Sequence, residues 1–124
     1  MPTKPVNLSA ILKVAGVGSQ LELLLLNRLE RAGLPTGEAQ FRIVPGRLWK
    51  WDRAWPSHHV AADVQGGIYS RRGDGHNRPS KIENDCRKAA AAAALGWRVL
   101  PITEKMIREG VAVELIAAAL GVEV

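Results

Sequence analysis

The sequence predicts an α/β fold in which a mixed central β-sheet is flanked by helices. Helical periodicity occupies both ends of the chain, strand-like segments fill its middle, and one further strand separates the last helical segments. The 124 residues, of which 47% are hydrophobic, match the size of one globular domain. We therefore expect residues 1–124 to form a single domain, with residues 1–8 as a loose terminus.

The first long helix is expected to begin at Ser19. Ser19 can cap the helix, Glu22 follows three residues later as in a capping box, and leucines recur at helical spacing. Gly33 and Pro35 then end the helical pattern. A shorter helix is expected over Ser9 to Val14, before a Gly-Val-Gly turn.

Three strands are expected to follow the first helix. The segments Gln40 to Val44, Leu48 to Trp55 and His59 to Ile68 carry β-branched or aromatic residues among polar ones. The sequence Pro56 to His58 is typical of a turn, so the second and third strands form an antiparallel hairpin. Residues 69–79 are glycine-rich and basic, which favours a mobile loop.

A second long helix is expected from Ser80 to Leu95. Ser80 and Glu83 have the spacing of a capping box, and Gly96 is placed as a left-handed stop. The run of alanines predicts close packing on the sheet, because small side chains permit a near approach. The charged residues of this helix then occupy its wetter face: Lys81, Asp85 and Lys88.

The last part of the chain predicts a strand followed by helical segments. Trp97 to Leu100 has the pattern of a short strand that ends at Pro101. Thr103 can cap the next helix, Gly110 interrupts it, and the apolar segment Val111 to Leu120 continues as a helix. The element order is therefore helix, three strands, helix, strand and helix, which gives a mixed sheet.

The positive charge of the chain is concentrated in its middle. The whole sequence has 17 Lys and Arg against 12 Asp and Glu, a net charge of +5. Residues 42–88 hold ten of the basic and five of the acidic residues, so this segment carries the whole excess. A localised positive field favours a polyanion such as DNA, because neutralised phosphates release counterions. A solvated basic surface is the alternative.

Neither a membrane nor an oxidising compartment is expected. The apolar runs are far shorter than the roughly 18 to 20 residues that span a bilayer, and the start lacks the pattern of a secretory signal. With Cys86 as the only cysteine, no internal disulfide forms, which fits a cytoplasmic location. A zinc site is not expected, because the histidines and Cys86 lack ligand spacing.

The predicted hairpin brings two carboxylates face to face. If it turns symmetrically about residues 57 and 58, Asp52 lies opposite Asp63, with Cβ atoms about 4.5 to 5.5 Å apart. Because alternate residues share a face, Lys50 and Gln65 form the next pair on that face. Two facing like charges destabilise a sheet unless a cation lies between them or one carboxyl is protonated.

A divalent cation would resolve this repulsion. Carboxylate oxygens suit a hard ion such as Mg²⁺ or Mn²⁺, which keeps several waters and accepts a phosphate oxygen. Two alternatives remain open at this point. Either each aspartate pairs with a nearby arginine, or the register differs by one residue and the facing pair disappears.

Three tryptophans lie on the expected second strand, at Trp49, Trp51 and Trp55, beside basic residues. They can stack on bases, as in proteins that bind single strands, or pack in the core. Trp49 and Trp51 are expected on the face opposite to the carboxylates, which favours the core.

Several residues and motifs, taken together and in order, point to a known family. They are Glu22, Trp51-Asp52, Asp63-Val64-Gln65-Gly66-Gly67, His76, Asp85, Lys88 and Gly96-Trp97-Arg98-Val99-Leu100. In this combination the chain resembles the PD-(D/E)xK, or restriction-endonuclease-like, nuclease superfamily. Within that superfamily it is most similar to small phage endonucleases and to very-short-patch-repair-like endonucleases. The resemblance covers about residues 19–120.

The resemblance implies a restriction-endonuclease-like core and hydrolysis of DNA phosphodiesters that depends on Mg²⁺ or Mn²⁺. It implies that Asp52 and Asp63 hold the metal and that Glu22 of the first helix reaches the same site. Asp63 stands where the family usually has glutamate, and Gln65 stands where it often has lysine.

In some members the lysine is displaced onto the following helix, where Lys88 or Lys81 can serve. Lys88 would then stabilise charge or orient the attacking water. The alternative is an ordinary ion pair with Asp85, three residues before it. The residues expected to contact DNA phosphates lie mainly in the basic loop: Arg71, Arg72, His76, Arg78 and Lys81.

These observations predict a metal-dependent DNA endonuclease of the phage or mobile-element type, acting in DNA processing, recombination or repair. Its expected location is the cytoplasm of a bacterium or of a phage-infected host. DNA and a divalent metal are the expected partners, and a homodimer would supply the two active sites that many nucleases need. Two alternatives are a nuclease-fold DNA-binding protein without turnover and a module that binds a protein through its apolar first and last helices.

Overall fold

The computed structural model describes residues 20–65 and 79–123. Four expected features lie outside these ranges: the loose terminus, the short helix over residues 9–14, the Ser19 cap and nearly all of the basic loop 69–79.

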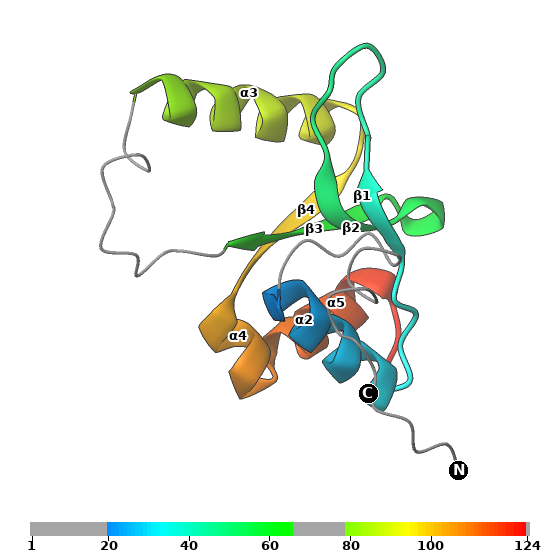
Figure 1. Cartoon of the computed structure of the whole chain (residues 1–124). Coiled ribbons are helices and arrows are strands. Elements are labelled where there is room, and N and C mark those ends of the chain that lie inside the picture. Colours follow the sequence, from blue (N-terminus) through cyan, green and yellow to red (C-terminus); the bar gives the residue numbers. More distant parts are fainter. Residues whose placement is uncertain (1–19, 66–78, 124) are drawn as a thin grey trace, which may run out of the picture.

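The described helices and strands alternate much as the sequence predicts. In chain order they are α2 (Gln20–Arg31), β1 (Glu38–Phe41), β2 (Trp51–Trp55), the 3₁₀ turn η1 (Pro56–His58), β3 (Val60–Gln65), α3 (Pro79–Ala94), β4 (Arg98–Thr103), α4 (Glu104–Glu109) and α5 (Val111–Leu120). The strands form one sheet in the order β1-β2-β3-β4. The first two pairings are antiparallel and the β3–β4 pairing is parallel, so the predicted mixed sheet is confirmed (Figure 1).

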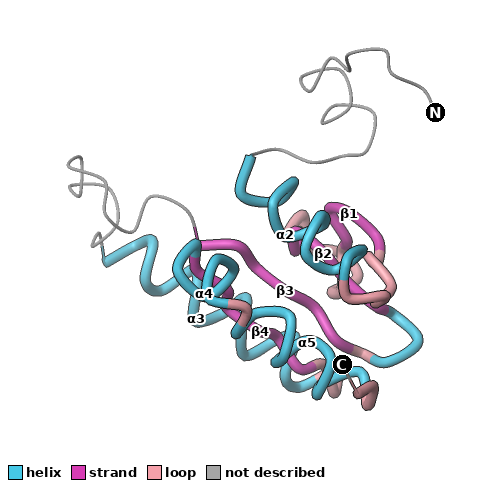
Figure 2. The backbone as a smooth tube through the Cα atoms, turned by 90° about the horizontal axis from the view of Figure 1, so that it is seen from below, coloured by secondary structure: helices cyan, strands magenta, loops and turns pink. Residues whose placement is uncertain are grey.

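Helices lie on both faces of this sheet. Helices α2, α4 and α5 cover one face and α3 covers the other, as Figures 1 and 2 show from two directions. The main core lies between the sheet and the first three helices. Its fully buried aliphatic side chains include Leu25, Leu29, Val60, Ile102, Ile107 and Ile116. A smaller core lies under α3 and contains Ile43, Trp51, Ala54, Ala61 and Ala92.

Helix α3 packs on the sheet over only part of its length. Ala92 is the buried residue of this helix, whereas Ile82 near its start is 51% exposed. The expected close packing of this helix on the sheet is therefore confirmed at Ala92, whereas Ile82 near its start does not pack there. A hollow lies between this part of α3 and the end of β3, and its lining is both polar, as at Asp63 and Gln65, and apolar, as at Val99.

Several element boundaries differ from the sequence prediction. Strand β1 was expected over Gln40 to Val44 but covers Glu38–Phe41, and β2 was expected from Leu48 but begins at Trp51. Two further differences have clear physical reasons. Strand β4 continues through Pro101 to Thr103, because β4 is an edge strand and a proline there loses no inter-strand hydrogen bond. Helix α3 begins at Pro79, so Ser80 lies inside its first turn. The Glu83 carboxylate accepts a hydrogen bond from Arg87 Nε at 2.8 Å, instead of completing a capping box.

Other helix ends agree with the prediction. The Thr103 side chain accepts a hydrogen bond from the Met106 N–H at 3.2 Å and so caps α4. Gly110 separates α4 from α5 with a φ of 83°, a left-handed conformation that a side chain would strain. The two last helices can therefore turn against the same core.

The strand β2 does not keep the regular alternation that the sequence suggests. Trp55 packs in the main core, whereas Trp51 packs in the core under α3. In the β1–β2 register Gln40 lies opposite Asp52, and Gln40 has a φ of +50°, which distorts the strand pair at this point. The prediction that Trp51 lies away from the carboxylates is thus wrong, because its ring lines the same hollow as Asp63. Trp51 and Trp55 are buried, as a core role requires, and Trp49 is half-buried.

Candidate active site

The β2–β3 hairpin has the register predicted from its turn. Arg53 pairs with Ala62, Ala54 with Ala61 and Trp55 with Val60. The alternative register, shifted by one residue, is therefore wrong. The next position of the same register places Asp52 opposite Asp63, where β2 and β3 stop pairing.

The two carboxylates end the strand ladder by exchanging hydrogen bonds with the opposite backbone. Oδ2 of Asp52 accepts a hydrogen bond from the Val64 N–H at 2.7 Å. The carboxylate of Asp63 accepts one from the backbone N–H of Asp52. The Gln40 amide donates a long hydrogen bond of 3.5 Å to Oδ1 of Asp52. These bonds fix both carboxylates side by side at one end of the hairpin.

Lys88 connects α3 with this pair. Its Nζ donates to the Lys50 carbonyl oxygen at 2.8 Å and lies 3.4 Å from Oδ2 of Asp63. The same Nζ lies 4.6 Å from the centroid of the Trp51 ring, close enough for a cation–π contact. The alternative in which Lys88 pairs with Asp85 is wrong, because Asp85 pairs with Lys81 at 3.1 Å.

The surroundings of Asp63 disfavour its charged form. Burial raises the pKa of Asp63, and the nearby Asp52 carboxylate raises it further. The Lys88 ammonium, together with hydrogen bonds from Lys88 and from the Asp52 backbone, opposes this rise without cancelling it. Burial is the largest of these effects, so an added cation beside Asp63 would favour its charged form.

Glu22 lies in a different setting from the one the family resemblance implies. It is 5% exposed on α2, and its charge acts on the guanidinium of Arg53, which is also 5% exposed. Burial lowers the pKa of Arg53, and the charges of Glu22 and Asp52 oppose this change. Arg53 also donates to the carbonyl oxygens of Thr36 at 2.9 Å and Gly37 at 2.8 Å. Arg53 is thus a buried cation between Glu22 and Asp52.

Within residues 20–65 and 79–123, no group of three or more His, Cys, Asp or Glu side chains is placed to hold a metal ion. Glu22 therefore does not join Asp52 and Asp63 in a three-ligand set there. The two aspartates still match the way in which Mg²⁺ binds to proteins, through one or two carboxylates, several waters and a substrate phosphate. The donor set is compatible with a hard divalent cation.

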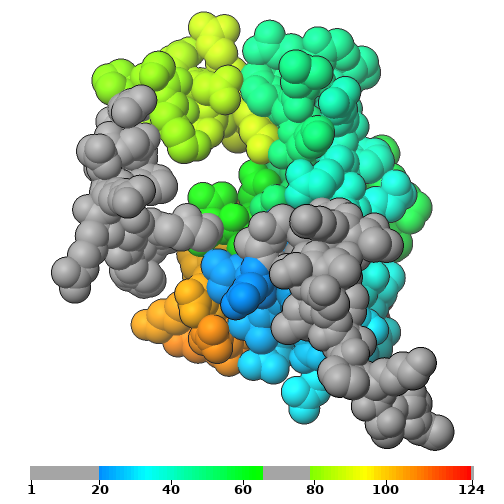
Figure 3. All heavy atoms as spheres, in the orientation of Figure 1, coloured from blue at the N-terminus to red at the C-terminus, as the bar shows by residue number. Residues whose placement is uncertain are grey.

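The hollow beside these residues has a volume of about 650 Å³. It opens between α3 and the end of β3, below the yellow-green spheres of α3 in Figure 3. Its polar lining comes from both elements: Asp63, Gln65, Lys81, Asp85 and Lys88. Gln65 is exposed at the end of β3 and shares this hollow with Asp63, as the predicted alternation requires.

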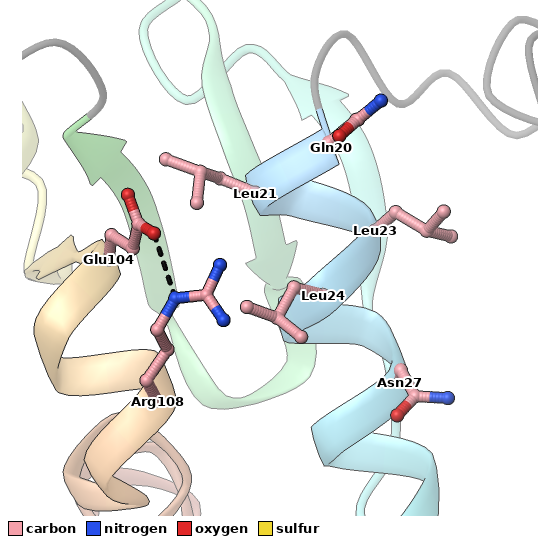
Figure 4. A pocket seen from close by; sticks show the side chains of 7 residues that line it. All are labelled: Gln20, Leu21, Leu23, Leu24, Asn27, Glu104 and Arg108. Atoms are coloured by element: carbon pink, nitrogen blue, oxygen red, sulfur yellow. Dashed lines mark hydrogen bonds and ion pairs between the residues drawn. The ribbon is translucent and has the colours of Figure 1, made fainter.

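A second hollow of about 570 Å³ lies between α2 and α4 (Figure 4). Leu21 and Leu24 point into it from α2, and the charged residues Glu104 and Arg108 line the opposite wall. These two charges pair with one another at 2.7 Å. The inner faces of α2 and α5 are buried in the main core, which weakens the alternative that these helices serve as a protein-binding surface.

Some predicted site residues lie outside the described ranges, and some contributors were missed. Arg71, Arg72, His76 and Arg78 all fall within residues 66–78. Two partners of Lys88, the Lys50 carbonyl and the Trp51 ring, were not among the predicted site residues. Arg53, one of the ten basic residues counted in residues 42–88, is buried, and its place between Trp51 and Trp55 on an expected strand is the signal that could have found it.

The described helices include none that is both long and apolar enough to span a membrane. No protein-family model matches the chain. Two uncharacterised proteins of Mycobacterium tuberculosis, from strains CDC 1551 and H37Rv, are 31% identical to it over 78 residues, which is 61% of this chain. The chain spans only 27% of the length of these relatives.

Among solved structures, the catalytic domain of the homing endonuclease I-Bth0305I is similar to this chain. The TM-score is 0.56, and the match covers 82% of this chain and 94% of that domain at 16% sequence identity. At this identity the likeness is one of fold. The chain therefore has an α/β fold similar to that of a nuclease catalytic domain.

Proposed function

We propose that this chain is a metal-dependent DNA endonuclease of the PD-(D/E)xK type. The observation that carries the proposal is the pair of carboxylates, Asp52 and Asp63, fixed side by side at the end of the β2–β3 hairpin with Lys88 in contact. The fold similarity to a homing endonuclease catalytic domain supports it independently. The concentration of positive charge in residues 42–88 supports a polyanionic substrate.

In this proposal Asp52 and Asp63 hold Mg²⁺ or Mn²⁺. Such an ion would supply Lewis-acid chemistry, by neutralising charge on the phosphoryl group and by making a bound water more acidic. A cation held by the two aspartates would favour the charged form of Asp63, which burial and the Asp52 carboxylate disfavour. In this proposal Glu22 does not bind the metal. Its carboxylate interacts with the guanidinium of Arg53, which also interacts with Asp52.

Lys88 supplies the positive charge that the motif lysine provides in other members of the family. Its Nζ is held by the Lys50 carbonyl and by Asp63, so the ammonium stays at the wall of the hollow. A preorganised cation there stabilises the negative charge that develops on the phosphoryl oxygens during hydrolysis. Gln65 lines the same hollow and can donate a hydrogen bond to a phosphate or a water, but it adds no charge.

Cleavage of supercoiled, branched and mismatched DNA in Mg²⁺ or Mn²⁺ tests this function directly. Asp52→Asn and Asp63→Asn should each lower the rate by more than about 100-fold, since even indirect partners of metal ligands cost about 10- to 100-fold. Glu114→Gln is the matched control, because it removes one exposed carboxylate from α5 on the other face of the sheet. Equal activity in wild-type and Asp52→Asn protein would refute the proposal.

A DNA-binding protein without turnover is the second candidate. Gln65 favours it, because an amide in the usual place of the lysine carries no positive charge. This candidate predicts salt-sensitive DNA binding without cleavage. Robust cleavage that EDTA abolishes would exclude it.

A further inference from the structure

The connection between β1 and β2, residues 42–50, is a basic arm that is separate in sequence from the predicted DNA-binding loop. Arg42, Arg47 and Lys50 are exposed, and the segment contains no acidic residue. The ion pairs formed within residues 20–65 and 79–123 use five other cations, and these three take part in none of them. Their charge is therefore available to an anionic partner.

The tip of this arm has a defined shape. The Arg47 N–H donates to the Val44 carbonyl oxygen at 3.3 Å, which closes a four-residue turn. Pro45 and Gly46 occupy its two central positions, and Gly46 has a φ of +80°. This is the geometry and composition of a type II turn. Leu48, just after the turn, is 79% exposed, so the tip projects clear of the folded body.

Side-chain contacts fix the base of the arm to α3 and to the candidate active site. Trp49 Nε1 donates to Oδ1 of Asn84 at 3.3 Å. The Lys50 carbonyl accepts from Lys88 Nζ, the same ammonium that contacts Asp63. Figure 3 shows the teal spheres of the arm beside the yellow-green spheres of α3. The arm is thus held next to the proposed cleavage site.

We propose that this arm grips the phosphate backbone of DNA beside the active site through Arg47 and Lys50, with Arg42 at its start as a further cation. The inference rests on the proposed function, because the substrate must be DNA. The Arg47 guanidinium carbon lies 4.1 Å from the centroid of the Trp49 ring. Stacking on a ring orients a guanidinium while its N–H edge stays free for the two oxygens of a phosphate.

The turn at the tip of the arm also favours this role. A turn that is already formed loses little conformational entropy when it binds, so its cations contribute to affinity without a large ordering cost. Phosphate contacts of this kind position a duplex without reading its sequence. We therefore expect the arm to fix the register of the DNA and to bind all sequences about equally.

The salt dependence of DNA binding tests the arm. Binding of a labelled duplex is measured by fluorescence anisotropy in EDTA, which prevents cleavage, from about 50 to 200 mM salt. The variant Arg47→Gln/Lys50→Gln should lower the slope of log Kd against log salt by about 2, since each phosphate contact contributes about 0.9. Kd should rise to a similar degree for unrelated duplexes.

The matched control removes two exposed cations from the other face of the sheet, in Arg31→Gln/Lys105→Gln on α2 and α4. It should keep the wild-type slope, and thermal unfolding of both variants checks that the fold is intact. If Arg47→Gln/Lys50→Gln kept the wild-type slope, the arm would not bind DNA phosphates, and the proposed nuclease function would still stand. If the wild-type protein bound no DNA at low salt, both the role of the arm and the proposed nuclease function would be wrong.

Discussion

The ammonium nitrogen of Lys88 lies 3.4 Å from Oδ2 of Asp63, across 25 positions of the sequence. The two side chains are only 20% and 24% exposed, whereas the Lys81–Asp85 pair on the same helix is 51% and 55% exposed. Solvent and salt therefore screen the Lys88–Asp63 pair less than its neighbour. The pair connects α3 with β3 and keeps a cation beside two carboxylates.

This relationship predicts which of two lysines serves the reaction. We expect Lys88→Met to lower the rate of DNA cleavage by about 100-fold or more, since loss of one donor to a developing oxyanion costs about 10²- to 10³-fold. Lys81→Met should cost far less, because Lys81 is an exposed partner of Asp85. Single-turnover cleavage of labelled duplex DNA measures both. A larger loss in Lys81→Met would show that the lysine role belongs to Lys81.

The raised pKa of Asp63 predicts a pH dependence of stability with a definite sign. The Asp63 carboxyl binds its proton more tightly in the folded protein than in the unfolded chain, where it has its ordinary pKa of 3.8. The free energy of unfolding contributed by Asp63 therefore falls as the pH rises from the ordinary value through the raised one. Asp63→Asn lacks this titration.

Urea unfolding of wild-type and Asp63→Asn protein at a series of pH values, in EDTA, isolates the effect of Asp63 from that of other carboxyls. The difference in the free energy of unfolding, wild type minus variant, should decrease across this interval. A difference that grew with pH would mean that Lys88 outweighs burial and the Asp52 charge.

The layered fold and the carboxylate pair could be predicted because local signals determine them. The Pro56 to His58 turn fixes the hairpin register, and that register alone places Asp52 opposite Asp63. Helix stops and caps, such as Gly96 and Thr103, mark element ends with little help from tertiary packing. The order of elements then leaves few arrangements for a mixed sheet.

The partners of Lys88 could not be predicted with the same means, because they depend on how α3 sits on the sheet. A three-residue spacing suggested Asp85, but Lys88 lies four residues before the buried Ala92 and shares its inward face. The position of Trp51 was missed because the distortion at Gln40 is a left-handed conformation in a residue type that seldom adopts it. Side chains stop alternating between the two faces of the sheet at such a point, and no sequence pattern predicts it.

Gly37, just before β1, and Gly46, at the tip of the arm, should differ in their tolerance of a side chain. Gly37 and Gly46 have φ values of +76° and +80°, so alanine strains the backbone at both by about 1 to 2 kcal/mol. A Cβ on Gly37 would also lie 2.5 Å from the Ala54 carbonyl oxygen, whereas a Cβ on Gly46 meets no atom within 4 Å. Overpacking of this kind adds about 1 to 3 kcal/mol.

We therefore expect Gly37→Ala to lower the free energy of unfolding more than Gly46→Ala, as measured by urea denaturation. Equal losses would mean that the strand β2 shifts freely to admit the new methyl group.

Metal binding at the two aspartates should be visible as a gain in stability, independent of any cleavage. Repulsion between the two carboxylates destabilises the folded state, and a bound cation would relieve it. The unfolded chain has no such site, so metal binding stabilises the folded state. A ligand at 100 times its Kd stabilises the folded state by about 2.7 kcal/mol. Thermal unfolding should therefore show a Tm several degrees higher in Mg²⁺ or Mn²⁺ than in EDTA.

Asp52→Asn and Asp63→Asn should lose this rise in Tm, while Glu114→Gln keeps it. A rise of equal size in all three variants would place the ion elsewhere on the protein, and its absence from the wild type would remove the metal from the proposed reaction.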